Sequence, residues 1–397
     1  MSDVRQPNRR GVLQGGLALL AASVLGPRVT LAGLGTRRAD PRLVVCILRG
    51  GQDGLAVAPP IGDPDYAALR PDAGAALPLD GHFGLHPALA PLLPWWEARS
   101  LALVHAVGLP TATRSHFAGQ DLLESGGAQP GDRREGLLYR ALGARGQGDS
   151  AVPAVAIGGA VPLLLRGPEV RAASLDPAND RRVDPGLMER IATLWAGDPL
   201  LGPALQEAER ARARCPANAA AGSSDADADA DARKSLKRPG FLRTALGTGR
   251  LLAADGGYRL AVVDTGGWDT HHGQAPRMQT QLADLAGGLL ALREGLGEDV
   301  WQRTIVLTVT EFGRTARPNG TGGTDHGTGG LALLAGGAVH GGRVYGDWPG
   351  LAASKLQDAR DLRTATDVRR LFATVLQVHM GLEDPALARV RPLAGVV

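Results

Sequence analysis

Short apolar runs recur along the chain, and most of them end in a turn that contains glycine. The runs are rich in leucine, valine and isoleucine and alternate little with polar residues, which is typical of parallel strands buried on both faces. Segments with helical periodicity separate them. This pattern predicts an α/β fold with a mostly parallel central sheet sandwiched by helices. The predicted strands are 42–48, 100–108, 151–159, 258–267, 303–313 and 330–337; the predicted helices are 87–98, 116–124, 185–196, 278–296 and 367–380, the last capped by Thr366.

The first 32 residues have the three parts of an export signal. Arg9 and Arg10 precede a modest apolar segment, 12–25, and small residues at 30–32 offer a cleavage site. Paired arginines before a weakly apolar segment are typical of the twin-arginine route. The apolar segment is too short and too rich in glycine for a stable membrane span. We therefore expect export to the periplasm by the twin-arginine machinery, with an ordinary basic N-terminus as the alternative.

The rest of the chain, 33–397, is expected to be a single domain with one unusual loop. Residues 215–238 are low in complexity, with alternating aspartate and alanine, and they lack the glycine and final glutamate of an EF-hand calcium loop. Strand patterns on both sides indicate that this loop interrupts one domain. Cys46 lies in an apolar run and is expected to be a buried thiol, although an oxidising compartment would permit a disulfide with Cys215.

The formal net charge of +3 comes from the expected export signal. Segment 1–32 carries four arginines and one aspartate, so the remaining chain has a net charge of about zero. A nucleic-acid partner is therefore not expected. Composition leaves the oligomeric state open.

The pattern Gly-Gly-x-Asp occurs three times, each time a few residues after a predicted strand. It places Asp53, Asp269 and Asp325 where the carboxyl ends of parallel strands gather ligands. Glycine permits sharp turns and close backbone approach, so the glycines are expected to bring the three acids together. His271, His272 and His326 lie in the same loops. Carboxylate and imidazole groups are ligands for Zn²⁺ or Mn²⁺, and the pattern predicts one or two such divalent ions.

The segment "TATRSHFAGQDLLESG" (111–126) brings hydroxyl, guanidinium and imidazole groups to the start of a predicted helix. Ser115 is either the cap of that helix or a nucleophile, with Thr113 as a second hydroxyl within reach. Arg114 would clamp an anionic oxygen, and His116 would bind a metal or transfer protons.

The segment "TEFGRT" (310–315) ends another predicted strand at the same edge. Glu311 is expected to bind the metal or to accept a hydrogen bond from one of its ligands. Arg314 would clamp an anion, and the alternative for the two residues is a structural ion pair.

Several of these segments together resemble the domain of unknown function 1501 family (DUF1501). The matching segments cover nearly all of 33–397 in order, and members often carry a twin-arginine leader. They are "LRGGQDGLAV" (48–57), "FGLHPALAPLLPWWEARSLALVHAVG" (83–108), "TRSHFAGQDLLESG" (113–126), "GGWDTHHGQ" (266–274), "TEFGRTARPNGTGGTDHGTGG" (310–330) and "GGRVYGDWPGL" (341–351).

This family looks like a branch of the alkaline phosphatase and sulfatase superfamily. The resemblance implies an alkaline phosphatase-like core with one metal held by Asp53, Asp325 and His326. A second metal would use Asp269 with His271 or His272, plus a further late histidine for which this chain has no clear match. "TRSHF" also departs from the superfamily's nucleophile motif.

The expected function is an exported metal-dependent hydrolase of phosphate or sulfate esters, acting on a small anionic ester. In that mechanism Ser115 would attack, and Arg114 or Arg314 would bind the remaining anionic oxygens. The alternative is a non-catalytic metal-binding structural or carrier protein that retains the fold. A metal-free serine hydrolase is not expected, because the chain lacks a Gly-x-Ser-x-Gly elbow.

Overall fold

The computed structural model describes most of the chain, and Pro41–Val397 form one compact unit. The expected export signal, the low-complexity stretch and Cys215 lie outside the described residues. Within the described part, no helix is long and apolar enough to cross a membrane. The described residues are 40–144, 152–169, 172–177, 184–199, 201–214, 240–254 and 256–397.

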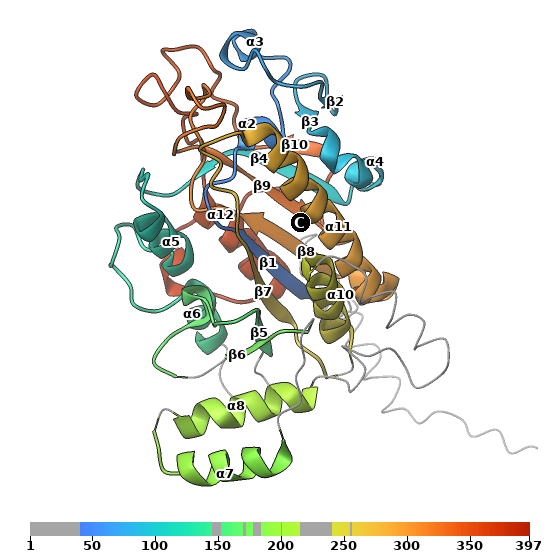
Figure 1. Cartoon of the computed structure of the whole chain (residues 1–397), viewed down its shortest axis with the longest axis vertical. Helices are drawn as coiled ribbons and strands as arrows, with labels where there is room; N and C mark the ends of the chain where they lie inside the picture. The colour runs from blue at the N-terminus through green and yellow to red at the C-terminus, as the bar shows by residue number, and fades with distance from the viewer. Residues whose placement is uncertain are drawn as a thin grey trace, which may run out of the picture. The chain divides into compact units, whose positions relative to one another are not determined.

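A large central sheet organises this unit (Figure 1). Among the described residues it has nine strands in the order β10-β4-β9-β8-β1-β7-β5-β6, with β11 paired to β4. All pairings are parallel except those of β9, which runs antiparallel to β4 and β8. The strands are β1 (Arg42–Leu48), β4 (Leu101–Gly108), β5 (Ala154–Ile157), β6 (Ala172–Leu175), β7 (Leu260–Thr265), β8 (Thr304–Val309), β9 (Gly330–Ala335), β10 (Arg343–Tyr345) and β11 (Thr366–Asp367); β2 (Leu77–Pro78) and β3 (Gly84–Leu85) form a separate hairpin.

The predicted α/β class, with a mostly parallel sheet between helices, is confirmed. The expectation that the run 330–337 is a parallel strand is wrong. The connection from β8 to β9 stays at the carboxyl edge of the sheet, so β9 must return in the opposite direction. This long connection carries Glu311, Arg314, Asp325 and His326.

Helices cover both faces of the sheet (Figure 1). The side chains of Val44, Cys46 and Leu48 point into one core with α10, α11 and α4, while the alternate residues of β1 point into a second core with α5, α6 and α12. Cys46 is a free buried thiol. The helices are α2 (Gly54–Val57), α3 (Tyr66–Leu69), η1 (Pro87–Leu92), α4 (Leu93–Glu97), α5 (His116–Ser125), α6 (Leu137–Ala144), η3 (Leu163–Leu165), α7 (Pro185–Trp195), α8 (Leu201–Arg214), α10 (Gly240–Ala253), α11 (Gln274–Trp301), α12 (Val368–Ala373), η4 (Thr374–Met380) and η5 (Pro385–Leu387).

Two helix predictions need correction in detail. The segment 87–98 is a 3-10 helix followed by α4, because Pro91 and Pro94 lack the N–H groups that a continuous α-helical ladder requires. The last helix is capped by the Asp367 side chain, which accepts from the Arg369 amide, and not by Thr366. Thr366 instead pairs with Val107 in the sheet.

Candidate metal centre

The three Gly-Gly-x-Asp loops meet around the buried guanidinium of Arg314. Its Nε donates to the carbonyl of Gly51 at 2.6 Å, and its terminal nitrogens donate to the carbonyls of Gly50, Trp268 and Thr324. One terminal nitrogen also lies 2.5 Å from Oδ1 of Asp269. The Arg314 side chain has no exposed surface, so it binds the loops together from inside and does not face a substrate.

Glycine is required where these loops touch. A Cβ on Gly50, whose φ is +126°, would lie 2.4 Å from the amide nitrogen of Asp269. A Cβ on Gly323 would lie 2.1 Å from the carbonyl carbon and oxygen of His271. Any larger residue would push the loops apart. The glycines therefore bring the polar side chains of the second and third loops into contact.

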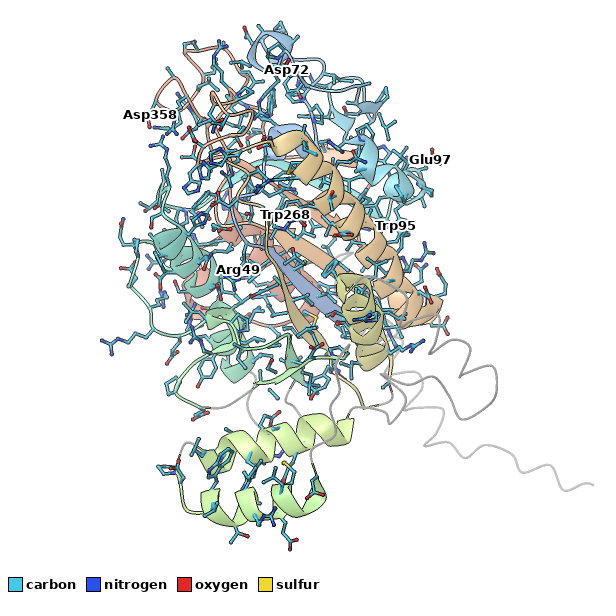
Figure 2. All side chains as sticks on the ribbon, in the orientation of Figure 1. Arg49, Asp72, Trp95, Glu97, Trp268 and Asp358 are labelled. Atoms are coloured by element: carbon cyan, nitrogen blue, oxygen red, sulfur yellow. The ribbon has the colours of Figure 1, made fainter. Side chains whose placement is uncertain are left out.

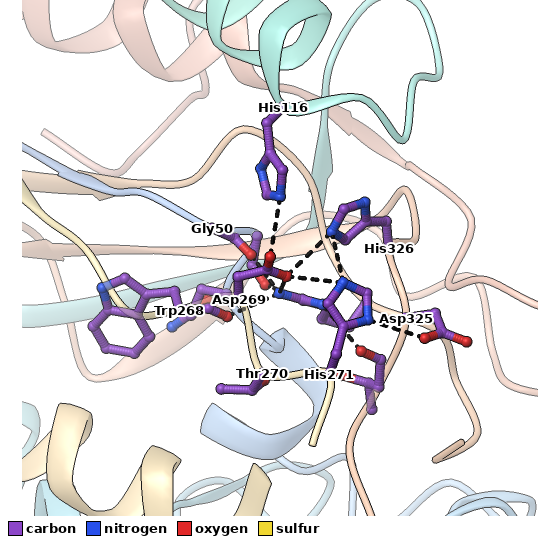
Figure 3. A network of polar contacts seen from close by, with 12 residues as sticks. Gly50, His116, Trp268, Asp269, Thr270, His271, Asp325 and His326 are labelled. Atoms are coloured by element: carbon purple, nitrogen blue, oxygen red, sulfur yellow. Dashed lines mark hydrogen bonds and ion pairs between the residues drawn. The ribbon is translucent and has the colours of Figure 1, made fainter. Parts of the chain in front are cut away.

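Three imidazoles converge on the carboxylate of Asp269 (Figure 3). Oδ1 of Asp269 lies 3.0 Å from Nε2 of His271 and 3.1 Å from Nε2 of His326. Its Oδ2 lies 3.4 Å from Nε2 of His116, which comes from the first turn of α5. The Nε2 atoms of His271 and His326 are themselves 3.0 Å apart.

The other nitrogen of each ring is held by an acceptor. Nδ1 of His116 bonds to Oε1 of the fully buried Glu311 at 2.8 Å, and Nδ1 of His271 bonds to Oδ1 of Asp325 at 3.0 Å. Nδ1 of His326 bonds to the main-chain carbonyl of Arg114 at 2.8 Å. Because a carbonyl and ionised carboxylates only accept, these bonds place a ring proton on each Nδ1 and direct the three Nε2 atoms towards Asp269.

The carboxylates around this cluster are stabilised as anions. Partial burial would raise the pKa of Asp269, but Arg314 and the adjacent histidines lower it to about 2. Burial would likewise raise the pKa of Glu311, yet hydrogen bonds from its own amide, His116 and the Gly50 amide lower it. Hydrogen bonds from Asn319 and His271 lower the pKa of Asp325. The centre therefore presents negative charge together with the Nε2 atoms of three imidazoles.

This arrangement fits a metal ion. His116, Asp269 and His326 are a His/Asp/His cluster that could hold one, and His271 adds a fourth converging atom. A tetrahedral ion with bonds near 2.0–2.1 Å has ligand atoms about 3.3 Å apart, close to the separations here. Two lone pairs facing each other at 3.0 Å repel unless a cation or proton lies between them. Hydrogen bonds to the outer ring nitrogens are typical of metal-binding histidines.

Asp53 lies in a different set of contacts. Its carboxylate accepts from Arg70 at 2.8 and 3.2 Å, from Nε2 of Gln274 at 2.6 Å and from the amide of Leu55. Burial would raise the pKa of Asp53, but Arg70 and Gln274 lower it. The structure therefore gives this carboxylate a buried cation as its partner, and it does not bring Asp53 into the histidine cluster.

The hydroxyl groups and Arg114 border the cluster. Ser115 is exposed and is the N-cap residue immediately before α5, but its side chain makes no capping bond. Thr113 Oγ1 accepts from the Ser115 amide at 3.2 Å. The Arg114 guanidinium pairs with Asp361 at 2.6 Å and with Asp358 at 2.8 Å, which fixes the loop whose carbonyl holds His326. His272 is exposed beside His271.

Three supporting residues were not expected from the sequence. Arg70 and Gln274 hold Asp53, and Asn319 donates to Asp325 and to the carbonyl of His271. Gln274 directly follows the second Gly-Gly-x-Asp loop, and that position is the signal that could have identified it. Arg70 has no such local signal.

Comparisons with known proteins give a family but no activity. A family model described as "Protein of unknown function (DUF1501)" matches residues 105–393. No curated protein matches this chain. The crystal structure of Ps i-CgsB in complex with k-i-k-neocarrahexaose is 10% identical, with a TM-score of 0.41, and covers 87% of this chain and 72% of that chain. Phosphonoacetate hydrolase from Sinorhizobium meliloti 1021 in complex with phosphonoformate is 15% identical, with a TM-score of 0.27, and covers 69% and 56%. At these TM-scores, no role is transferred from either structure.

Proposed function

The chain belongs to the DUF1501 family of proteins of unknown function, and we propose that it is a metal-dependent hydrolase of small phosphate or sulfate esters. The observation that supports this proposal is the convergence of three Nε2 atoms on the Asp269 carboxylate at the sheet edge. Three nitrogens and one oxygen suit Zn²⁺ or Mn²⁺, and the described ligands form one cluster, which favours a single ion.

His116, His271, His326 and Asp269 would hold the ion, with Glu311 and Asp325 orienting two of the rings. A divalent ion bound there would supply Lewis-acid polarisation of a phosphate or sulfate ester. The side chains at this centre are partly exposed, with 43% exposure for Asp269 and 30% for His116, so a small ester has access to it.

Ser115 is our proposed nucleophile. It lies between Arg114, whose carbonyl holds His326, and His116, and its hydroxyl is not used as a helix cap. The first amides of α5 lack partners within the helix and would favour an anionic ester group beside this hydroxyl. An attack by Ser115 Oγ on phosphorus or sulfur would displace the alcohol and leave an ester on the serine, which water would then hydrolyse.

We also propose that the protein is exported through the twin-arginine machinery to the periplasm. The paired Arg9 and Arg10 and the apolar segment that follows support this location.

The second candidate function is metal binding without turnover. The guanidinium groups of Arg114 and Arg314, which an anion clamp would use, are both engaged with protein carboxylates. Asp53 is likewise paired with Arg70. A carrier or structural protein that retains the metal ligands would tolerate these pairings.

Elemental analysis of the purified protein and assays on a panel of phosphate and sulfate esters test the two candidates. We expect about one equivalent of metal, lost in His326→Ala. Ser115→Ala should abolish turnover with metal content unchanged, whereas Ser100→Ala, whose hydroxyl bonds to the Trp95 carbonyl, should behave as the parent. Metal binding without turnover of any ester would favour the carrier. Full activity in Ser115→Ala would transfer the nucleophile role to Thr113, which Thr113→Val then tests.

A further inference from the structure

A groove lies at the opposite end of the sheet from the candidate metal centre. The centre follows the carboxyl ends of β1, β7 and β8, whereas this groove lies where β4 and β10 begin, where β9 ends and where α11 ends. Its volume is about 770 Å³, within the usual range for small-molecule sites. Figure 2 shows Trp95 on this side, against the later turns of α11.

Most of the charged residues that line the groove are arginines. Arg99, Arg293 and Arg343 line it together with His340, and Glu298 is the one carboxylate among the lining residues. Glu298 is already bonded to Arg293 at 3.0 Å and to Gln302 at 2.6 Å. Positive charge in the groove is therefore only partly balanced.

Arg99 and Arg343 carry that unbalanced charge. Both are exposed, and neither forms an ion pair with any residue in the part of the chain that the structure describes. The Arg99 side chain packs against the main chain at Gly342, the residue before Arg343, because a Cβ on Gly342 would lie 3.1 Å from Cγ of Arg99. The Arg343 guanidinium lies 4.7 Å from the ring centre of Tyr345, and such stacking holds it in place.

The backbone of Arg99 is an independent observation. Its φ is +58°, in the left-handed region that favours glycine, two residues before β4 begins. This conformation is strained for a residue with a Cβ. Residues held in such conformations cluster where their side chains serve binding. A glycine would fill this turn without strain, so Arg99→Gly removes the side chain without straining the backbone.

We propose that this groove binds a small organic anion that carries at least two anionic groups. Arg99 and Arg343 line one groove without counter-ions, and a dianion would supply the missing negative charge while matching the planar donors of arginine. The apolar surface contributed by Pro91, Leu290 and Val339 would contact the organic body of the ligand. The site is separate from the metal centre and does not depend on the proposed hydrolysis.

Isothermal titration calorimetry with naphthalene-1,5-disulfonate, a rigid dianion that chelates metals poorly, tests this proposal at constant ionic strength. Naphthalene-1-sulfonate is the matched monoanion. We expect the full-length protein to bind the disulfonate at least tenfold more tightly than the monosulfonate. Arg99→Gly and Arg343→Ser should each weaken disulfonate binding at least tenfold. Arg389→Ser, which removes an exposed arginine elsewhere, should leave the affinity unchanged.

Arg99→Gly also separates binding from folding. Because glycine accepts φ near +58°, this variant should keep or raise the melting temperature while losing affinity. The proposal is overturned if the parent protein does not distinguish the dianion from the monoanion. It is equally overturned if Arg99→Gly keeps full affinity, or if Arg389→Ser loses as much affinity as the groove variants.

Discussion

At the scale of single residues, the structure separates side chains that can bind a metal from those that orient them. Glu311 has no exposed surface and touches Nδ1 of His116, the Gly50 amide and Gln120. It therefore acts on the centre through His116 and not by direct contact. Asp325 has the same relation to His271. Such outer carboxylates fix the tautomer and the direction of the ring.

Replacing Glu311 by glutamine should weaken metal binding. The amide keeps the size of the side chain but loses the charge that holds the Nδ1 proton of His116. We expect an affinity lower by about 10- to 100-fold, measured by competition with a chromophoric chelator. Glu298→Gln, at the far edge of the sheet, is the matched control and should bind metal normally. Equal affinities in all three proteins would show that Glu311 has no influence on the ligand.

His105 predicts a pH dependence of stability. It is buried against Phe83 and Trp348, with Nε2 3.0 Å from the Ala58 carbonyl, and burial lowers its pKa from 6.5 to about 4. Between these values the unfolded chain binds the proton and the folded chain does not, so stability falls as the pH drops from 6.5 towards 4. The full effect is up to ~3 kcal/mol.

Urea unfolding at several pH values, in the parent and in His105→Gln, measures this contribution. The difference in unfolding free energy between the two proteins should shrink on acidification, because the variant has no proton to gain at this position. A difference that stays constant from pH 7 to 4.5 would contradict the assignment. The comparison removes the contributions of the other titrating groups that both proteins share.

At the scale of elements, the loops that join strands to helices build the centre, and their glycines set how closely they approach. Glycines in the third loop differ in their surroundings. A Cβ on Gly323 would collide with the main chain of His271, whereas a Cβ on Gly320 would meet nothing within 4 Å. The two positions therefore form a natural pair for testing loop contact.

Gly323→Ala should destabilise the protein and weaken metal binding, and Gly320→Ala should do neither. The added methyl group forces the loop of Asp325 away from that of His271, at a cost of roughly 1–3 kcal/mol. Thermal melting and metal titration on both variants measure the effect. If the two alanine variants behaved alike, the close approach of these loops would not govern the site.

The sequence predicts where the strands and loops lie better than it predicts which side chains contact one another. Apolar runs followed by Gly-Gly-x-Asp correctly place the loops at the carboxyl edge, because strands buried on both faces carry a strong pattern. The same local pattern surrounds Asp53 and Asp269, yet only Asp269 meets histidines. Arg70 neutralises Asp53 and Gln274 donates a hydrogen bond to it, both from other parts of the chain, and the Glu311–His116 contact spans 195 positions. Contacts between residues so far apart in the chain produce no periodic pattern in a single sequence.

At the scale of the whole molecule, the two ends of the sheet offer different chemistry. The carboxyl end gathers carboxylates and imidazoles around a candidate metal position, and the amino end gathers guanidinium groups in an open groove. Both are built on a sheet with a buried core on each face. This division allows a substitution at one end to be tested without altering the other.

The proposed export concerns the entire precursor, and it can be tested separately from the folded unit. Replacing Arg9 and Arg10 together by lysine should keep the precursor in the cytoplasm, because the twin-arginine machinery selects the arginine pair. Cell fractionation followed by immunoblotting measures the location. Lysine replacement of Arg369 and Arg370, an arginine pair in the folded unit, is the control and should leave delivery unchanged. Normal periplasmic delivery of the Arg9/Arg10 variant would exclude this route.

The buried guanidinium of Arg314 has a consequence for how the loops of the centre unfold. One side chain satisfies main-chain carbonyls from all three Gly-Gly-x-Asp loops, so no loop can detach without leaving donors or acceptors unpaired in the interior. The loops therefore belong to one cooperative unit and should open together in a single step. Hydrogen exchange would then report one common opening free energy for their amides. A substitution that removes this guanidinium should therefore release all three loops at once.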